Sequence, residues 1–329
     1  MKKITALFTA AVIAASAGIT AHAEGESLVV LGDSITSGYG LDGYVSGDDY
    51  SAAGSFANRL GENYAEYSNF AVDGRTSGEL LTALEDEDIS AALAGADTVI
   101  VSIGGNDFLQ PMITAAMNKA AENPDLLKIM SGGADALGAL TSGDISDEDA
   151  DKYFDIMMDF TRAMTEAADS VDISQVVGNI DSILETVSEK SPESQIVVLT
   201  VYNPFEGVTG MELFDTMART KLEELNSGIA SAAESNGAQV ADVHAAFAGH
   251  ALDYTNISSM DIHPNKDGHG VIYQLLLDIT GADLNAVTAE TTLPAGEKGS
   301  PDTGVSGFAV VAGVAVLAGA VLVISRKRS

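Results

Sequence analysis

Short apolar runs rich in β-branched residues, separated by helical stretches, constrain the fold of this 329-residue chain most strongly. Four of them predict buried strands at residues 27–31, 67–72, 98–103 and 195–201, and a weaker run predicts a fifth at 239–243. Because near-continuous apolar runs indicate strands buried on both faces, the sequence predicts a parallel sheet between two layers of helices. The fold class is therefore α/β, in one large domain.

Helices are predicted at residues 78–93, 211–234 and 266–279. Residues 108–192 carry no strand signal, but their apolar residues recur at helical spacing, which predicts a helical insertion after the third strand. The insertion leaves the carboxyl end of that strand, where open α/β sheets bind ligands. It is predicted either to cover the substrate or to serve as a packing layer.

The amino-terminal segment predicts export. Lys2 and Lys3 precede an apolar run, and the segment closes on Ala21, His22 and Ala23. A charged start, an apolar middle and small residues at the end are typical of a secretory signal peptide. We expect residues 1–23 to be removed and the folded domain to occupy residues 24–285.

The carboxyl-terminal segment predicts an anchor. Residues 305–324 form an uncharged run long enough to cross a bilayer, and residues 325–329 form a basic tail of the kind found on the cytoplasmic side. Residues 286–304 combine a spacer with the motif Ser-Pro-Asp-Thr-Gly, which resembles a sortase sorting signal with Ser300 at its first position. The resemblance implies cleavage after Thr303 and attachment to a Gram-positive-type cell wall; the alternative is a simple membrane anchor.

Composition excludes several partners and cofactors. The formal net charge of −32 argues against nucleic acid as a partner. The chain has no cysteine, so disulfides and thiolate metal sites are excluded. His250 and His269, with Asp267 nearby, show no recognised ligand spacing, so neither a metal nor another cofactor is predicted.

Four polar motifs lie at or near strand-to-helix transitions. Gly-Asp-Ser ends at Ser34, Gly74 follows the second strand, Gly-Gly-Asn-Asp places Asn106 after the third, and His263 precedes the last helix with Asp261 beside it. A serine, a histidine base, a carboxylate that orients the base and N–H donors are what acyl transfer requires. These transitions can bring the motifs to one site.

In this order, the four motifs resemble those of the SGNH (GDSL-type) hydrolases, over roughly residues 28–279. The resemblance implies a flavodoxin-like three-layer α/β/α sandwich with a five-stranded parallel sheet. It also implies that Ser34 is the nucleophile and that His263 accepts its proton. The backbone N–H groups of Ser34 and Gly74 and the side chain of Asn106 would form the oxyanion hole.

The sequence departs from the family at the orienting acid. The family places an aspartate three residues before the histidine, where this chain has Met260. Asp261, two residues before, is our predicted acid, with a backbone carbonyl or Asp253 as alternatives. Asp33 is predicted to have a structural hydrogen-bonding role.

The predicted function is hydrolysis of carboxylic esters at the cell surface through an acyl-enzyme on Ser34. The substrate would be an acylated lipid or an acetylated glycan, and sortase would be the partner that anchors the enzyme. Two alternatives use the same fold: a non-catalytic carbohydrate-binding or adhesion module, and an acyltransferase to a sugar.

Overall fold

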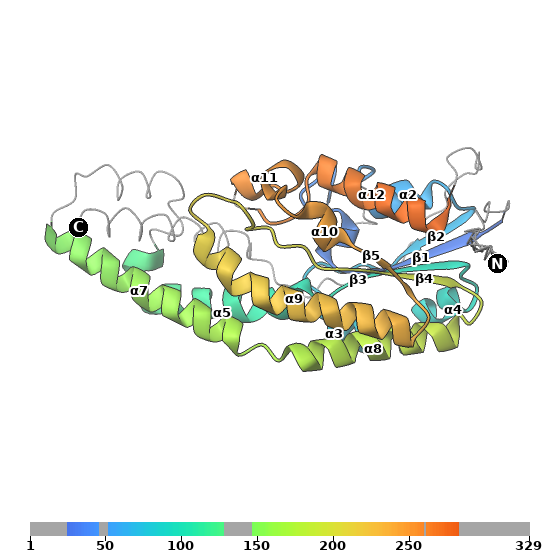
Figure 1. Ribbon diagram of the computed structural model, residues 1–329, viewed down its shortest axis with the longest axis horizontal. Helices are drawn as coiled ribbons and strands as arrows, with labels where there is room; N and C mark the ends of the chain where they lie inside the picture. The colour runs from blue at the N-terminus through green and yellow to red at the C-terminus, as the bar shows by residue number, and fades with distance from the viewer. Residues whose placement is uncertain (1–24, 46–51, 128–146, 260, 283–329) are drawn as a thin grey trace, which may run out of the picture.

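A single parallel sheet forms the centre of the protein. The computed structural model describes residues 25–45, 52–127, 147–259 and 261–282. The strands form one sheet in the order β2-β1-β3-β4-β5 (Figure 1). Their bounds are β1 Ser27–Gly32, β2 Glu66–Asn69, β3 Thr98–Ser102, β4 Gln195–Leu199 and β5 Gln239–Ala241. The predicted five-stranded parallel sheet and α/β class are confirmed.

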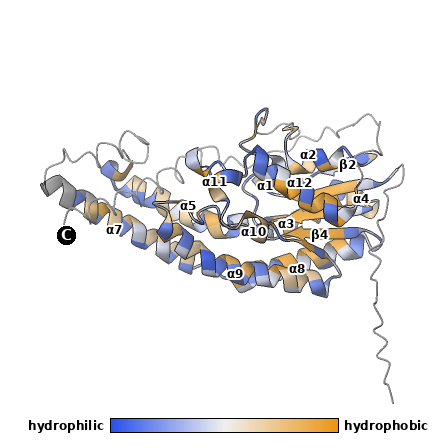
Figure 2. Cartoon of the chain, turned by 45° about the horizontal axis from the view of Figure 1, so that its top comes forward, coloured by the Kyte–Doolittle hydropathy of each residue, from blue (hydrophilic) through white to orange (hydrophobic). Residues whose placement is uncertain are grey.

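Helices cover both faces of the sheet. Alternate residues of β1 point to opposite faces: Val29 and Leu31 join one buried cluster, and Leu28 and Val30 join the other. One face carries α3 Ser77–Ala83, α4 Glu87–Ala94, α5 Gly105–Glu122, α8 Ile173–Lys190 and α9 Glu212–Ser235; the other carries α2 Phe56–Gly61, α10 Val243–Phe247 and α12 Lys266–Thr280. Figure 2 shows hydrophobic strands enclosed by helices of mixed polarity, so the sheet has no solvated face, as predicted.

Two predicted elements differ from the structure, and short polar side chains explain both. The predicted helix over 78–93 is wrong in extent, because it is two helices, α3 and α4. The Asp86 side chain accepts hydrogen bonds from the backbone N–H groups of Asp88 and Ile89 and so starts α4 anew. The strand predicted to reach residue 72 ends at Asn69, whose side chain accepts from the N–H of Ala71 and turns the chain.

Between β3 and β4 the described chain is helical. It forms α5, α7 Asp147–Asp169 and α8. The helix α8 packs on α9, α3 and β4, within the layer that covers the sheet. By contrast, α5 and α7 pack on each other, are joined by an ion pair between Lys119 and Asp159 at 2.8 Å, and extend past the sheet (Figure 1).

The predicted targeting segments lie outside the described residues. These are the signal peptide at 1–23, the spacer and sorting motif at 286–304, the apolar span at 305–324 and the basic tail at 325–329. Within the described ranges, none of the helices combines the length and apolar character needed to cross a bilayer.

Candidate active site

The strand order places a crevice at the carboxyl ends of β1 and β3. From β1 the chain crosses over to β2 on one side, and from β3 it crosses to β4 on the other. Crossovers that diverge in this way leave an opening between adjacent strand ends, which is where open α/β sheets bind ligands. The short helix α1 Ser34–Ser37 begins directly after β1, and α5 begins close after β3.

Ser34 is held at this opening by the two residues before it. A Cβ on Gly32 would lie 2.2 Å from Thr36 Oγ1 and 2.7 Å from the Ser102 carbonyl oxygen, so only glycine allows β1 to pass this close to its neighbours. The Asp33 side chain then caps α1 by accepting from the N–H of Ile35 at 3.0 Å. Ser34 thus occupies the first turn of α1 with 8% of its surface exposed.

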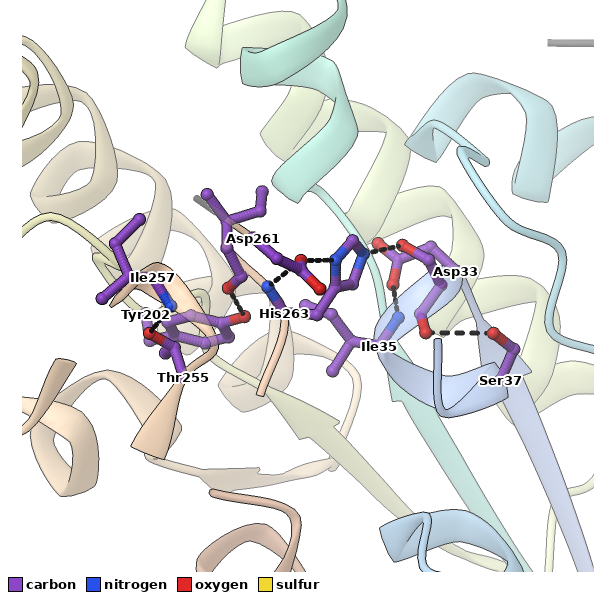
Figure 3. A network of polar contacts seen from close by, with 10 residues as sticks. Asp33, Ile35, Ser37, Tyr202, Thr255, Ile257, Asp261 and His263 are labelled. Atoms are coloured by element: carbon purple, nitrogen blue, oxygen red, sulfur yellow. Dashed lines mark hydrogen bonds and ion pairs between the residues drawn. The ribbon is translucent and has the colours of Figure 1, made fainter. Parts of the chain in front are cut away.

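His263 lies between Ser34 and Asp261. Its Nε2 is 2.9 Å from Ser34 Oγ, and its Nδ1 is 2.6 Å from Asp261 Oδ1 (Figure 3). Because an ionised carboxylate only accepts hydrogen bonds, Nδ1 carries the proton and Nε2 is left to accept from the Ser34 hydroxyl. The three side chains therefore form a hydrogen-bonded series in which His263 can take the proton of Ser34 while Asp261 holds the imidazole in place.

The two-residue spacing between Asp261 and His263 has a local explanation. Asp261 Oδ1 also accepts from the backbone N–H of His263 at 3.0 Å, which is an Asx turn. One oxygen therefore fixes both the backbone and the ring of His263. The structure brings Asp261 to the position expected of the orienting acid, whereas the alternative, Asp253, pairs with His250 at 3.1 Å on the surface.

Two tyrosines that the sequence analysis gave no role support His263. The hydroxyl of buried Tyr202 donates to the carbonyl oxygen of Ile262 at 2.7 Å (Figure 3). The Tyr39 ring lies against the imidazole, with centroids 4.8 Å apart. Tyr202 lies three residues after the end of β4, at the carboxyl edge of the sheet, so its position was a usable signal, but nothing in the sequence pointed to Tyr39.

The three predicted oxyanion donors belong to three segments: Ser34 to α1, Gly74 to the loop after β2, and Asn106 to α5. The Asn106 side chain donates from Nδ2 to Asp33 Oδ2 at 3.2 Å and to the carbonyl oxygen of Arg75 at 3.0 Å. Between Arg75 and Asp73 lies Gly74, whose φ of +75° is a left-handed conformation that favours glycine. Asn106 is thus joined both to the residue before Ser34 and to the loop that carries Gly74.

Burial perturbs the carboxyl group of Asp33. It is 2% exposed, and burial raises its pKa to about 7, although the Ile35 N–H and the electrostatic effect of His263 oppose the rise. The carboxylates of Asp73 and Asp107 raise the pKa further. Asp33 therefore has the structural hydrogen-bonding contacts that we expected, but it titrates near neutral pH.

The raised pKa of Asp33 predicts a pH-dependent cost to stability. Between pH 3.8 and about 7, the folded protein keeps a proton on Asp33 that the unfolded chain has released. Unfolding then releases this proton, so the free energy of unfolding falls as pH rises through this window, by up to about 4 kcal/mol at about 1.4 kcal/mol per pKa unit. Asp33→Asn removes this titration, so urea unfolding at pH 5 and pH 8 should show a smaller loss of stability in the variant. Equal losses in both proteins would contradict the assignment.

The remaining histidines with nearby carboxylates do not gather into a site. His269 is fully buried and accepts from the N–H of Phe56 through Nδ1 at 3.2 Å, while His250 is on the surface. In the part of the chain that the structure describes, no group of three or more potential ligands could hold a metal ion.

A parallel sheet with an aspartate, a histidine and a serine in hydrogen-bonding order at its carboxyl edge is the construction of a serine hydrolase of the α/β class. Comparison with known proteins narrows the class. Residues 30–271 match the GDSL-like Lipase/Acylhydrolase family, so the chain belongs to this family and is a carboxylic ester hydrolase. It is also 24% identical to Lipase 1 of Streptomyces coelicolor over 250 residues, which cover 73% of this chain and 77% of that protein.

Solved structures agree on the fold. An extracellular lipase from Streptomyces rimosus superposes with a TM-score of 0.51 at 20% identity, covering 78% of this chain and all of that one. A phospholipase A1 from Streptomyces albidoflavus gives a TM-score of 0.50 at 20% identity, covering 78% of this chain and 99% of that one. At this identity the likeness is one of architecture.

Proposed function

We propose that this protein hydrolyses esters through an acyl-enzyme on Ser34, and the contacts of His263 with Ser34 and Asp261 carry the proposal. As Ser34 Oγ attacks the ester carbonyl, its proton moves to His263 Nε2. The leaving alcohol then takes this proton from His263. A water molecule, deprotonated by the same nitrogen, attacks the acyl-enzyme, and His263 passes this proton to Ser34 Oγ as its bond to the acyl group breaks and the acid is released. Asp261 holds the ring in position and stabilises the imidazolium in both steps.

The oxyanion of each tetrahedral intermediate would accept hydrogen bonds from the N–H groups of Ser34 and Gly74 and from Asn106 Nδ2. The two N–H bonds of Asn106 Nδ2 are directed at Asp33 and at the Arg75 carbonyl oxygen. One of these contacts must be shared or released when the oxyanion forms. The contact with Asp33 is the longer one, at 3.2 Å, and it weakens when Asp33 is protonated, because a neutral carboxyl group is the poorer acceptor.

The location that we propose is the cell surface. Two of the similar proteins come from Streptomyces and are described as an extracellular lipase and a phospholipase A1. Together with the order of segments in the sequence, this supports export, and the motif at residues 300–304 supports sortase attachment. In a host with sortase, a wall hydrolase but not detergent should then release the protein. Release by detergent alone would instead indicate a membrane anchor.

An ester panel tests the proposed activity. We expect the protein to hydrolyse p-nitrophenyl esters within the series from acetate to palmitate, because the chemistry requires only a carbonyl at Ser34 Oγ. A preference for acetate would indicate an acetylesterase acting on glycans, and a preference for long chains would indicate a lipase. A well-folded protein that turns over no ester of the series, with or without a sugar acceptor, would contradict the proposal.

A further inference from the structure

The loop that carries Gly74 has to be held still if its N–H is to bind an oxyanion. Ser34 and Asn106 lie in the first turns of α1 and α5, whereas Gly74 lies in irregular chain after β2. The peptide bond between Asp73 and Gly74 is planar, so the direction of the Gly74 N–H is set by the orientation of that plane. If this plane rotates, the Gly74 N–H changes direction. Gly74 is not part of a helix, so no helical hydrogen bonds restrain that rotation.

The side chain of Asp73 is fixed at both oxygens by residues that follow the nucleophile. Ser37 Oγ donates to Asp73 Oδ1 at 2.6 Å, and the Tyr44 hydroxyl donates to Asp73 Oδ2. Ser37 is fully buried and is the last residue of α1, the helix that begins with Ser34. The carboxylate therefore ties the Asp73–Gly74 peptide to the helix of the nucleophile itself.

The same loop is held on its other side by α5. Gln110 Nε2 donates to the carbonyl oxygen of Gly74 at 2.6 Å, and Asn106 donates to the carbonyl oxygen of Arg75. Both side chains come from the first two turns of α5. The loop is thus clamped between the two helices that supply the other oxyanion donors.

We propose that Asp73 is a positioning residue that aligns the Gly74 N–H with Ser34, and that Ser37 and Tyr44 are the groups through which it acts. The inference rests on the proposed function. Asp73 touches neither Ser34 nor His263 in the contacts described, so its effect is on the alignment of a donor. Because that donor acts on charge that develops in the transition state, loss of the alignment lowers kcat and leaves KM almost unchanged.

The test compares three substitutions in the full chain: Asp73→Ala, Ser37→Ala and Tyr44→Phe. Tyr44→Phe removes one hydroxyl and retains the ring, which packs on Tyr39 with centroids 5.0 Å apart. We expect kcat on p-nitrophenyl butyrate to fall about 10- to 100-fold for Asp73→Ala, less than the 10²- to 10³-fold typical for removal of a whole donor. Ser37→Ala and Tyr44→Phe should each lower kcat several-fold. Combining either with Asp73→Ala should lower kcat little further, since all three substitutions disturb the hydrogen bonds of the same carboxylate. Asp42→Ala is the matched control, because Asp42 is an exposed aspartate that lies between Ser37 and Tyr44 in the sequence.

The outcomes distinguish a role of Asp73 in aligning the Gly74 N–H from any other role of Asp73. Binding of an alkylboronic acid, which mimics the tetrahedral intermediate, should weaken in step with kcat, and active-site titration should give an unchanged fraction of active enzyme. If Asp73→Ala does not fold, Tyr44→Phe carries the test alone. Variants with kcat per active site within twofold of wild type, or with a raised KM and unchanged kcat, would overturn the inference. An inactive wild-type protein would instead overturn the proposed function.

Discussion

Ser34→Ala is expected to lower kcat for p-nitrophenyl butyrate by at least about 10⁴-fold, the largest effect of any single substitution in this protein. Removal of Oγ abolishes the covalent intermediate, so no other step can compensate. The residual rate should come from the oxyanion donors, which still polarise a bound carbonyl toward water. Steady-state hydrolysis, with the background rate in buffer subtracted, measures the effect.

Stability provides the control for Ser34→Ala. The described contact of Oγ is with His263 Nε2 alone, so the variant should fold with a free energy of unfolding close to that of wild type. Ser231→Ala, at an exposed serine of α9, removes a hydroxyl far along the chain from the site and should leave kcat unchanged. Substantial turnover by a folded Ser34→Ala variant would show that the nucleophile lies elsewhere.

The strands, and the meeting of the candidate site residues at one edge of the sheet, were predictable because both depend on strong, local signals. The apolar runs at β1, β3 and β4 are bounded by polar residues, and a parallel sheet brings the carboxyl ends of such strands to one edge. Hence the sequence alone predicts that Ser34 and Asn106 lie close together. In the structure, Asp33 accepts hydrogen bonds from the N–H of Ile35 in α1 and from Asn106 Nδ2 in α5, so the two segments lie close together.

The contacts that could not be predicted join segments that share no sequence periodicity. Tyr39 lies five residues after Ser34 and Tyr44 ten residues after it, and no helical or strand-like apolar pattern connects either tyrosine with Ser34. Their contacts with His263 and Asp73 arise because the chain after α1 turns back across the site. The break between α3 and α4 was missed for a different reason: Asp86 lies within the predicted helix over 78–93, and nothing in the sequence marked it as the cap of a new helix.

Asp261→Ala is expected to lower kcat about 10³- to 10⁴-fold. Without the carboxylate, His263 loses the acceptor that keeps the proton on Nδ1 and loses the Asx turn that fixes its backbone. Nε2 then presents a proton to Ser34 in part of the molecules, and the imidazolium of the transition state lacks its counter-charge. Hydrolysis of p-nitrophenyl butyrate, together with far-ultraviolet circular dichroism to verify the fold, measures the effect.

Asp253→Ala is the matched control because Asp253 was the other side-chain candidate for the orienting acid. Its carboxylate pairs with His250 at the surface, so this variant should retain wild-type kcat. If instead Asp253→Ala loses activity and Asp261→Ala stays within tenfold of wild type, the order of contacts around His263 is not the one used in catalysis. The expected result would show that the spacing of two residues, rather than three, still forms a working catalytic triad, because a single oxygen of Asp261 accepts hydrogen bonds from both the backbone N–H and the ring of His263.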